Sequence, residues 1–186
     1  MARGIRLLLA FLLGACAQLP PELDPQEKFA ALRDRLREAA PGEVVIVINN
    51  NAIGGTHAGM FAGNLLSDPS GSYVSHRSRD PRWPGPSVAD YVAFQLEDGD
   101  NVRVYRFSLE APEFAEIVAR VRGAGPTPPL FCAVALQNQI AGVGPFSRIE
   151  RIGWTSPSAL AVRLDAAVTG NNVTAGACLR PSGAAC

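Results

Sequence analysis

One cysteine at the start of a predicted helix has the setting that covalent chemistry requires. Cys132 follows Pro128 and Pro129, which interrupt any preceding structure, and an apolar helical pattern continues from it to about Ile140. A thiol at a helix N-terminus lies at the positive end of the helix dipole, where the thiolate is favoured. Cys132 is therefore a candidate nucleophile toward an acyl carbon, with its own backbone N–H contributing to an oxyanion site. The alternative, favoured by composition alone, is an inert core residue.

A nucleophilic thiol needs a base, and the sequence contains two histidines, His57 and His76. His57 lies among the glycine-rich residues 54–60, at the start of a predicted strand, whereas His76 lies in an arginine-rich loop and is expected to be exposed. A strand orients an imidazole ring better than a loop does. His57 is therefore the candidate general base, and the alternative is a structural histidine beside a close backbone approach.

A predicted hairpin brings an aspartate toward this histidine. Gly63 and Asn64 form a two-residue turn signal between strands at 56–62 and 65–67. In that register, alternation places His57 on the same face as Asp68, its diagonal neighbour. Asp68 could accept the ring N–H of His57 and fix its tautomer. Asp68 also opens an Asp-Pro-Ser-Gly turn sequence, and the asparagines at 49–51 are rivals for orienting the ring.

The first 15 residues have the form of a bacterial lipoprotein signal peptide. Arg3 and Arg6 make a short basic region, residues 7–13 are apolar, and small residues precede Cys16. The apolar run is shorter than the ~20 residues that span a bilayer. We expect Cys16 to become the lipid-modified first residue of the mature protein. An ordinary signal peptide followed by an incidental cysteine is the alternative.

The residue after Cys16 and the overall charge indicate where the protein acts. In sorted lipoproteins, which this segment resembles, a residue other than Asp directly after the lipid-modified cysteine indicates the outer membrane. Ala17 stands at that position, so attachment to the outer membrane, facing the periplasm, is expected. The chain has 17 basic and 17 acidic residues, and cleavage would remove Arg3 and Arg6. The slightly acidic mature chain is not expected to bind nucleic acid, and the lipid alone is expected to attach it to the membrane.

The two C-terminal cysteines predict a disulfide. Cys178 and Cys186 flank the turn-forming residues 179–185, and an oxidising periplasm favours their pairing. With Cys16 assigned to lipid, Cys132 is the unpaired cysteine of the chain. An unpaired thiol in an exported protein is either buried and inert or retained for its reactivity.

The positions of turns and apolar patterns predict one α+β domain, an antiparallel sheet of four or more strands packed against helices. We assign residues 16–23 to a tether, 24–168 to the domain and 169–186 to a loosely ordered tail. Residues 70–86 are expected to be a loop that either crosses a cleft or is simply solvated. The predicted elements are a helix from Asp24 to about Pro41, strands at 44–48, 56–62, 65–67 and 102–107, and helices at 87–96, 112–122, 132–140 and from Ser156.

Other kinds of active site have no motif in this sequence. It contains no Gly-x-Ser-x-Gly, His-Glu-x-x-His or Cys-x-x-Cys, and no phosphate-binding glycine loop. Two distant histidines make a poor zinc site. We therefore expect neither a metal nor a cofactor, and cysteine-based acyl transfer is the chemistry that remains.

The order of the two central motifs resembles the circularly permuted papain-like cysteine hydrolases of the NlpC-type superfamily, which include the YaeF/YiiX-like amidases. The resemblance lies in residues 56–61 (THAGMF) on a strand, followed far downstream by residues 131–135 (FCAVA) on a helix. Ordinary papain-like enzymes have the cysteine helix first, whereas here the histidine precedes. The resemblance covers roughly residues 43–165. Relatives often have a longer polar residue in place of Asp68, and often a Ser or Thr in place of Ala133.

This resemblance implies a papain-like core with Cys132 and His57 in a groove between helix and sheet, and Asp68 in the third position. It also implies a thiol hydrolase that cleaves amide bonds, with cell-wall peptides as the expected substrates and lipid or thioester acyl groups as a further class. The alternative is a non-catalytic periplasmic lipoprotein that uses the same core for binding or assembly. In either case the loop at 77–83 could bind or cover a ligand.

Overall fold

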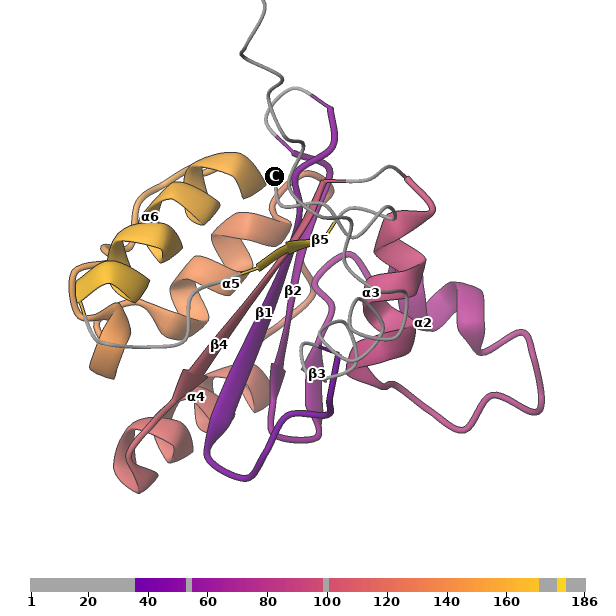
Figure 1. Cartoon of the computed structure of the whole chain (residues 1–186), viewed down its shortest axis with the longest axis horizontal. Helices are drawn as coiled ribbons and strands as arrows, with labels where there is room; N and C mark the ends of the chain where they lie inside the picture. Colours follow the sequence, from indigo (N-terminus) through magenta and orange to yellow (C-terminus); the bar gives the residue numbers. More distant parts are fainter. Residues whose placement is uncertain (1–35, 53–54, 99–100, 171–176, 180–186) are drawn as a thin grey trace, which may run out of the picture.

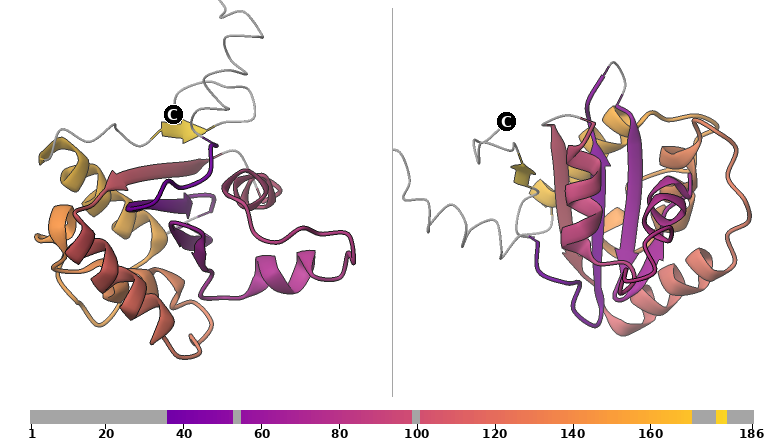
Figure 2. Two further views of the ribbon diagram at one scale, coloured as in Figure 1. Left: turned by 90° about the horizontal axis from the view of Figure 1, so that it is seen from below. Right: turned by 90° about the vertical axis from the view of Figure 1, so that its right-hand side faces the viewer.

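The computed structural model describes residues 36–52, 55–98, 101–170 and 177–179. They form an α+β fold in which one antiparallel sheet lies between two layers of helices, as Figures 1 and 2 show. The strands are β1 (Glu43–Asn49), β2 (His57–Ala62), β3 (Leu65–Ser67), β4 (Val102–Ser108) and β5 (Ala177–Leu179), and the helices are α2 (Ser72–Arg77), α3 (Val88–Leu96), α4 (Ala111–Arg122), α5 (Cys132–Ile140) and α6 (Pro157–Gly170), with a 3₁₀ turn η1 (Gly144–Phe146).

Several sequence predictions concern residues that lie outside the described ranges. These are the signal peptide, Cys16 with its tether, the part of the predicted helix from Asp24 to residue 35, and Cys186 with the disulfide that it would form. The prediction that this helix continues to about Pro41 is wrong, because residues 36–40 are not helical and instead bind Glu43 through Arg37 and the N–H of Ala40. Among the described residues, no helix is both long and apolar enough to cross a membrane.

The central strand β1 is covered on both faces. The sheet order is β3-β2-β1-β4-β5, with every neighbouring pair antiparallel, and all seven residues of β1 are buried. An unbroken β-branched run predicts such a strand, because side chains on both faces must find apolar partners. Val44, Ile46 and Ile48 pack on the side of α4, α5 and α6, whereas Val45 and Val47 pack toward α2 and α3.

The hairpin between β2 and β3 has the predicted register. Gly63 has a φ of 58°, and Ala62 pairs with Leu65. The third strand is only three residues long and ends at Ser67, which pairs with Met60. Among the described strands, none pairs with the outer edge of β2 beyond Met60, from Gly59 back to His57.

Two segments are more ordered than their composition predicts. Residues 72–77 form α2 inside the segment predicted to be a loop, because Tyr73 is fully buried and its N–H donates to the Asp68 carboxylate. The tail assigned to 169–186 contains β5, which pairs with Val102–Val104. A sheet edge offers unpaired backbone groups to any extended segment, so a Gly- and Ala-rich segment can complete it without an apolar pattern of its own.

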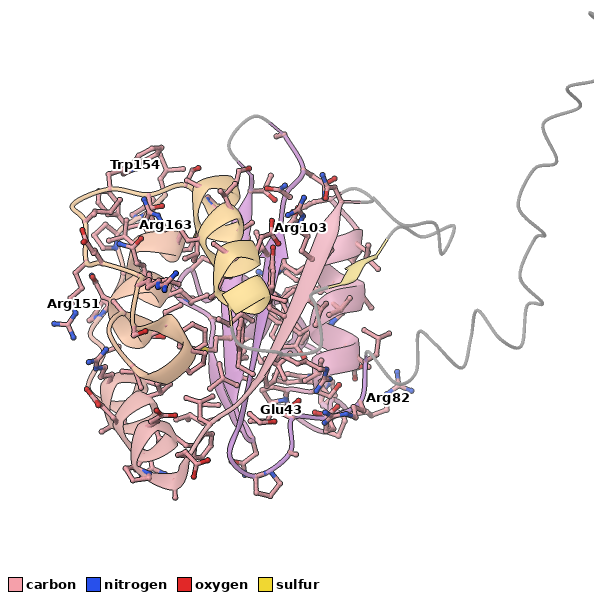
Figure 3. The ribbon with its side chains drawn as sticks, turned by 60° about the vertical axis from the view of Figure 1, so that its left-hand side comes forward. Glu43, Arg82, Arg103, Arg151, Trp154 and Arg163 are labelled. Carbon is pink, nitrogen blue, oxygen red and sulfur yellow. The ribbon has the colours of Figure 1, made fainter. Side chains whose placement is uncertain are left out.

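Helix α6 is tied to both the sheet and α5. On the sheet side, Asp165 accepts hydrogen bonds from Arg103 Nη1 at 2.7 Å and from Tyr105 Oη at 2.9 Å. On the other side, Arg163 donates to the side chain of Gln137, which is fully buried on α5. In Figure 3, Arg103 and Arg163 lie on opposite sides of α6, and Trp154 lies at the surface. Helix α5, which carries Cys132, is thereby attached to α6.

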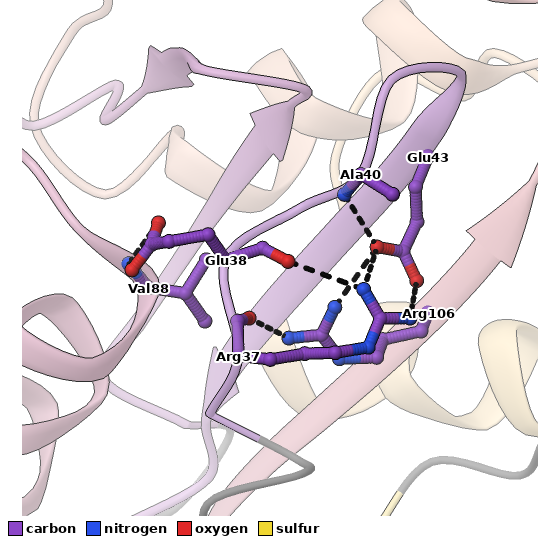
Figure 4. Close-up of polar contacts among 6 residues, drawn as sticks. All are labelled: Arg37, Glu38, Ala40, Glu43, Val88 and Arg106. Atoms are coloured by element: carbon purple, nitrogen blue, oxygen red, sulfur yellow. Dashed lines mark hydrogen bonds and ion pairs between the residues drawn. The ribbon is translucent and has the colours of Figure 1, made fainter.

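A buried carboxylate at the start of β1 attaches the preceding segment to the sheet (Figure 4). Glu43 is 3% exposed, and its oxygens accept from both terminal nitrogens of Arg37, at 2.7 and 2.8 Å, and from Arg106 at 3.0 Å. The N–H of Ala40 adds a fourth bond at 2.9 Å. Burial by itself raises the pKa of Glu43, but these partners outweigh burial and hold the pKa below its ordinary value.

Replacing Glu43 with glutamine is expected to destabilise the fold by about 3 kcal/mol, because two guanidinium groups lose the buried charge that they share. Because the pKa of Glu43 is lowered, its contribution is present above pH 4.5 and lost as pH falls through that lowered pKa. Urea unfolding at neutral and acidic pH measures both effects. The control is Asp80→Asn, which removes an exposed pair with Arg82 and should cost under about 1 kcal/mol. Equal losses in the two variants would contradict the prediction.

Candidate active site

The structure brings Cys132, His57 and Asp68 together at the outer edge of β2. Cys132 is the first residue of α5, His57 is the first residue of β2, and Asp68 directly follows β3. Leu130, just before the helix, has a φ of 69°, a left-handed conformation that is unfavourable for a leucine. Such strain is concentrated at functional sites, and here it turns the chain into α5 with the thiol directed inward.

The thiol occupies the edge of β2 that β3 leaves open. Cys132 is 7% exposed, forms no disulfide among the described residues, and packs in the core on the α4–α6 side. Its sulfur accepts hydrogen bonds from the backbone N–H groups of Ala58 and Ala133. Because alternate N–H groups of β2 point toward β3, and β3 ends opposite Met60, the N–H of Ala58 is free to meet the sulfur.

The imidazole ring reaches the thiol from the other face of the sheet. His57 shares its face of β2 with Gly59 and Phe61, on the side of α3, and is 7% exposed. Its Nε2 lies 2.8 Å from Asp68 Oδ1, so Nδ1 is the ring nitrogen left for Cys132. The thiol and ring interact across the sheet edge, which is possible because none of the strands that the structure describes covers that edge.

Asp68 makes both of the contacts that the sequence suggested for it. Its backbone carbonyl accepts from Gly71 N at 2.9 Å and so begins the turn, while its side chain, 3% exposed, points inward to His57. Three further donors reach the carboxylate: Tyr73 N–H at 3.1 Å on Oδ2, and the hydroxyls of Ser70 at 3.4 Å and Tyr91 at 3.5 Å on Oδ1.

The rival side chains are engaged elsewhere. Asn49 donates to Gln95 and accepts from Asn51, Asn50 accepts from Ser158, and Asn51 accepts from the N–H of Asn101. The asparagines at the end of β1 therefore serve the loop and helix contacts at that end of the sheet. His76 is exposed on α2, with its ring 5.5 Å from that of Phe94.

The electrostatics of the site favour a thiolate–imidazolium pair. Burial by itself lowers the pKa of His57, but hydrogen bonds and charge from Asp68 and the Cys132 thiolate raise the pKa to about 9. Burial likewise raises the pKa of Cys132, and here His57 and the N–H groups of Ala58 and Ala133 outweigh it, so that the pKa lies below its ordinary 9.0. A thiol made acidic beside a protonated ring is an activated nucleophile.

The arrangement supplies the groups needed for acyl transfer. The sulfur can attack a carbonyl carbon, His57 can carry the proton, and Asp68 fixes the ring orientation. As the first residue of α5, Cys132 has a backbone N–H without an acceptor inside the helix, so that N–H can stabilise an oxyanion. In the part of the chain that the structure describes, no group of three or more His, Cys, Asp or Glu side chains is placed to hold a metal ion.

The loop at 77–83 borders a cavity that does not include the candidate active site. This cavity has a volume of about 390 Å³ and is lined by residues of α2, the following loop and the start of α3, namely His76, Arg77, Asp80, Arg82, Trp83, Pro84, Gly85, Ser87 and Asp90. Cys132, His57 and Asp68 are not among its lining residues. Arg77 is held by Asp90 at 3.0 Å and by Glu97 at 3.4 Å, so its charge is compensated within the protein.

Sequence reasoning missed the contribution of α3 to the site. Tyr91 lies on the buried face of that helix with Val88, Val92 and Gln95, at spacings that indicate packing alone. Its hydroxyl lies over Gly59, where an added Cβ would be 1.9 Å from the oxygen. The glycines around His57 did indicate a close approach, but not which residue makes it.

Replacing Gly59 with alanine is expected to destabilise the protein by about 1–3 kcal/mol or more, because the new methyl group would overlap the Tyr91 hydroxyl and ring. Urea unfolding and the rate of Cys132 alkylation measure the damage to fold and site. Gly153→Ala is the matched control, since its Cβ would meet no atom within 4 Å. A Gly59→Ala protein as stable and as reactive as this control would show that the close packing is not required.

Comparisons of this chain with protein-family models, with curated proteins and with solved structures give no match.

Proposed function

We propose that this protein is a thiol hydrolase that cleaves amide bonds through an acyl-enzyme on Cys132. The observation that carries the proposal is the joined set of contacts at the edge of β2. The thiol interacts with the His57 ring, and the opposite ring nitrogen is held by Asp68 at 2.8 Å. An inert core cysteine has no need of an imidazole whose orientation is fixed by a buried carboxylate.

The reaction follows from the protonation states of the pair. The Cys132 thiolate attacks the amide carbon, and the carbonyl oxygen becomes an oxyanion near the first turn of α5. The C–N bond then breaks as the His57 imidazolium gives its proton to the leaving amine. Water attacks the thioester while His57 takes a proton from it, which releases the carboxylic acid and restores the thiolate–imidazolium pair.

Cell-wall peptides are the substrate class that we propose. Cys132 begins a helix that packs against an antiparallel sheet, and a strand earlier in the chain carries His57. This arrangement supports a permuted papain-like enzyme of the NlpC type. The resemblance of residues 1–15 to a lipoprotein signal peptide, with Ala17 after Cys16, supports attachment to the outer membrane, facing the periplasm, where such peptides occur. Other acyl or thioester substrates would use the same site.

The proposal is tested by incubating the full chain with cell-wall peptide fragments and following release of amines. Acid quenching during turnover, followed by peptide mass mapping, should find the acyl group on Cys132. A sample first alkylated at Cys132 is the control and should release nothing. Absence of cleavage together with a thiol that reacts only after denaturation would instead favour a binding or assembly protein.

A further inference from the structure

A buried tyrosine approaches the candidate site from the layer opposite α5. Tyr91, on α3, is fully buried, and its ring centroid lies 5.6 Å from that of Phe61 and 6.4 Å from that of His57. Its hydroxyl occupies the space over Gly59 that any side chain would fill. Because Gly59 has no side chain, there is space over β2 close to His57, and the Tyr91 hydroxyl from α3 fills that space.

The partner of this hydroxyl is the carboxylate that holds His57. Tyr91 Oη donates to Asp68 Oδ1 over 3.5 Å, and this carboxylate oxygen, Oδ1, also lies 2.8 Å from His57 Nε2. Burying a hydroxyl without a hydrogen-bond partner costs free energy. If only the aromatic ring were needed at this position, phenylalanine would pack there without that cost. The hydroxyl is therefore suited to a role at Asp68.

A second donor holds the other carboxylate oxygen. The N–H of Tyr73, in the first turn of α2, donates to Asp68 Oδ2 over 3.1 Å. The Ser70 hydroxyl also reaches Oδ1, at 3.4 Å, but Ser70 is exposed and can turn to water. Two buried donors on different oxygens limit rotation of the carboxylate about its Cβ–Cγ bond, and Tyr91 is the one that binds Oδ1, the oxygen that faces His57.

We propose that Tyr91 is a positioning residue, whose hydroxyl aims Asp68 Oδ1 at His57 and so maintains the thiolate–imidazolium pair. It acts through Asp68 and does not touch the substrate. The inference rests on the proposed function in that Cys132 and His57 work as a pair. Its test measures the thiol directly and needs no substrate, so the two can fail separately.

The experiment is the pH dependence of Cys132 alkylation by iodoacetamide in the full chain, measured by peptide mass mapping. Tyr91→Phe keeps the ring and removes the donor. The loosened carboxylate should hold the imidazolium less well, so the midpoint for thiolate formation should move up by about one pH unit. Where hydrolysis is measurable, kcat should fall about tenfold with KM unchanged.

Tyr73→Phe is the matched control. It removes a buried hydroxyl from the same aromatic cluster, but one that donates to Asp90 at 2.9 Å, and it keeps the N–H on Asp68. Its midpoint should equal that of the wild type. An unchanged or lowered midpoint in Tyr91→Phe, or equal shifts in both variants, would overturn the inference. A shift confined to Tyr91→Phe in a protein that cleaves no amide would support the positioning role and contradict the hydrolase.

Discussion

Replacing Cys132 with alanine is expected to abolish amide cleavage, with kcat/KM falling more than about 10⁴-fold, because the variant lacks the sulfur that forms the acyl-enzyme. The His57 ring and the first turn of α5 would remain but would have no nucleophile to serve. The loss is measured as amine release from cell-wall peptide fragments, together with the absence of any covalent adduct. Alanine fits the site, so unfolding temperatures should stay within a few degrees of the wild type.

Cys132→Ser separates reactivity from packing. Serine has nearly the size of cysteine, but its hydroxyl is far less acidic than a thiol and would not transfer its proton to His57 to form an ion pair. We therefore expect a folded serine variant with almost no activity, and an imidazole that has lost one of the two groups raising its pKa. Substantial activity in either the alanine or the serine variant would place the nucleophile elsewhere in the chain.

Replacing Asp68 with asparagine is expected to lower kcat/KM about 10³-fold and to narrow its pH profile from both sides. Asp68 and the Cys132 thiolate together raise the pKa of His57 to about 9, so the basic limb of the profile should lie near that value and move to lower pH in the variant, which keeps only the thiolate. With a less basic ring, the pKa of Cys132 should rise toward its ordinary value, which moves the acidic limb up. The pH dependence of kcat/KM measures both limbs.

The same substitution should change how stability depends on pH. Because the pKa of His57 is raised in the folded protein, the protonated ring stabilises the fold fully below pH 6.5, and this stabilisation is lost as pH rises through about 9. Asp68→Asn should remove most of this dependence, as urea unfolding across the range would show. Asp90→Asn, which alters a carboxylate bound to Tyr73 and Arg77, is the control and should leave it in place. A pH profile unchanged in Asp68→Asn would rule out Asp68 as the group that orients His57.

Local signals in the sequence were enough to define the elements that carry the site. The helix predicted from Cys132 to about Ile140 is confirmed, as is the two-residue turn that sets the register of β2 and β3. The diagonal placement of His57 and Asp68 follows from that register, because strand alternation has a period of two. These features depend on neighbours within about ten residues, so the sequence could reveal them.

Contacts between distant segments could be decided only by the tertiary structure. The sequence offered four candidates to orient His57, and the packing of Asn49 against Gln95 on α3 helped to leave Asp68 as the one that does. Helix α2 within the predicted loop, and β5 within the predicted tail, depend on partners supplied by other elements. Their local composition therefore did not predict them.

For Cys132, too, the sequence predicted some features, and the tertiary structure decided others. Its residue type, its helix start and its lack of a nearby cysteine were evident from the sequence. Whether the sulfur could reach His57 depended on β3 ending at Ser67, which leaves the β2 edge open so that a thiol from one face meets a ring from the other. The sequence determined that Cys132 and His57 are present and how each is placed on its own helix or strand. The early end of β3 decided that they meet, because their contact crosses an edge of β2 that a longer β3 would have covered.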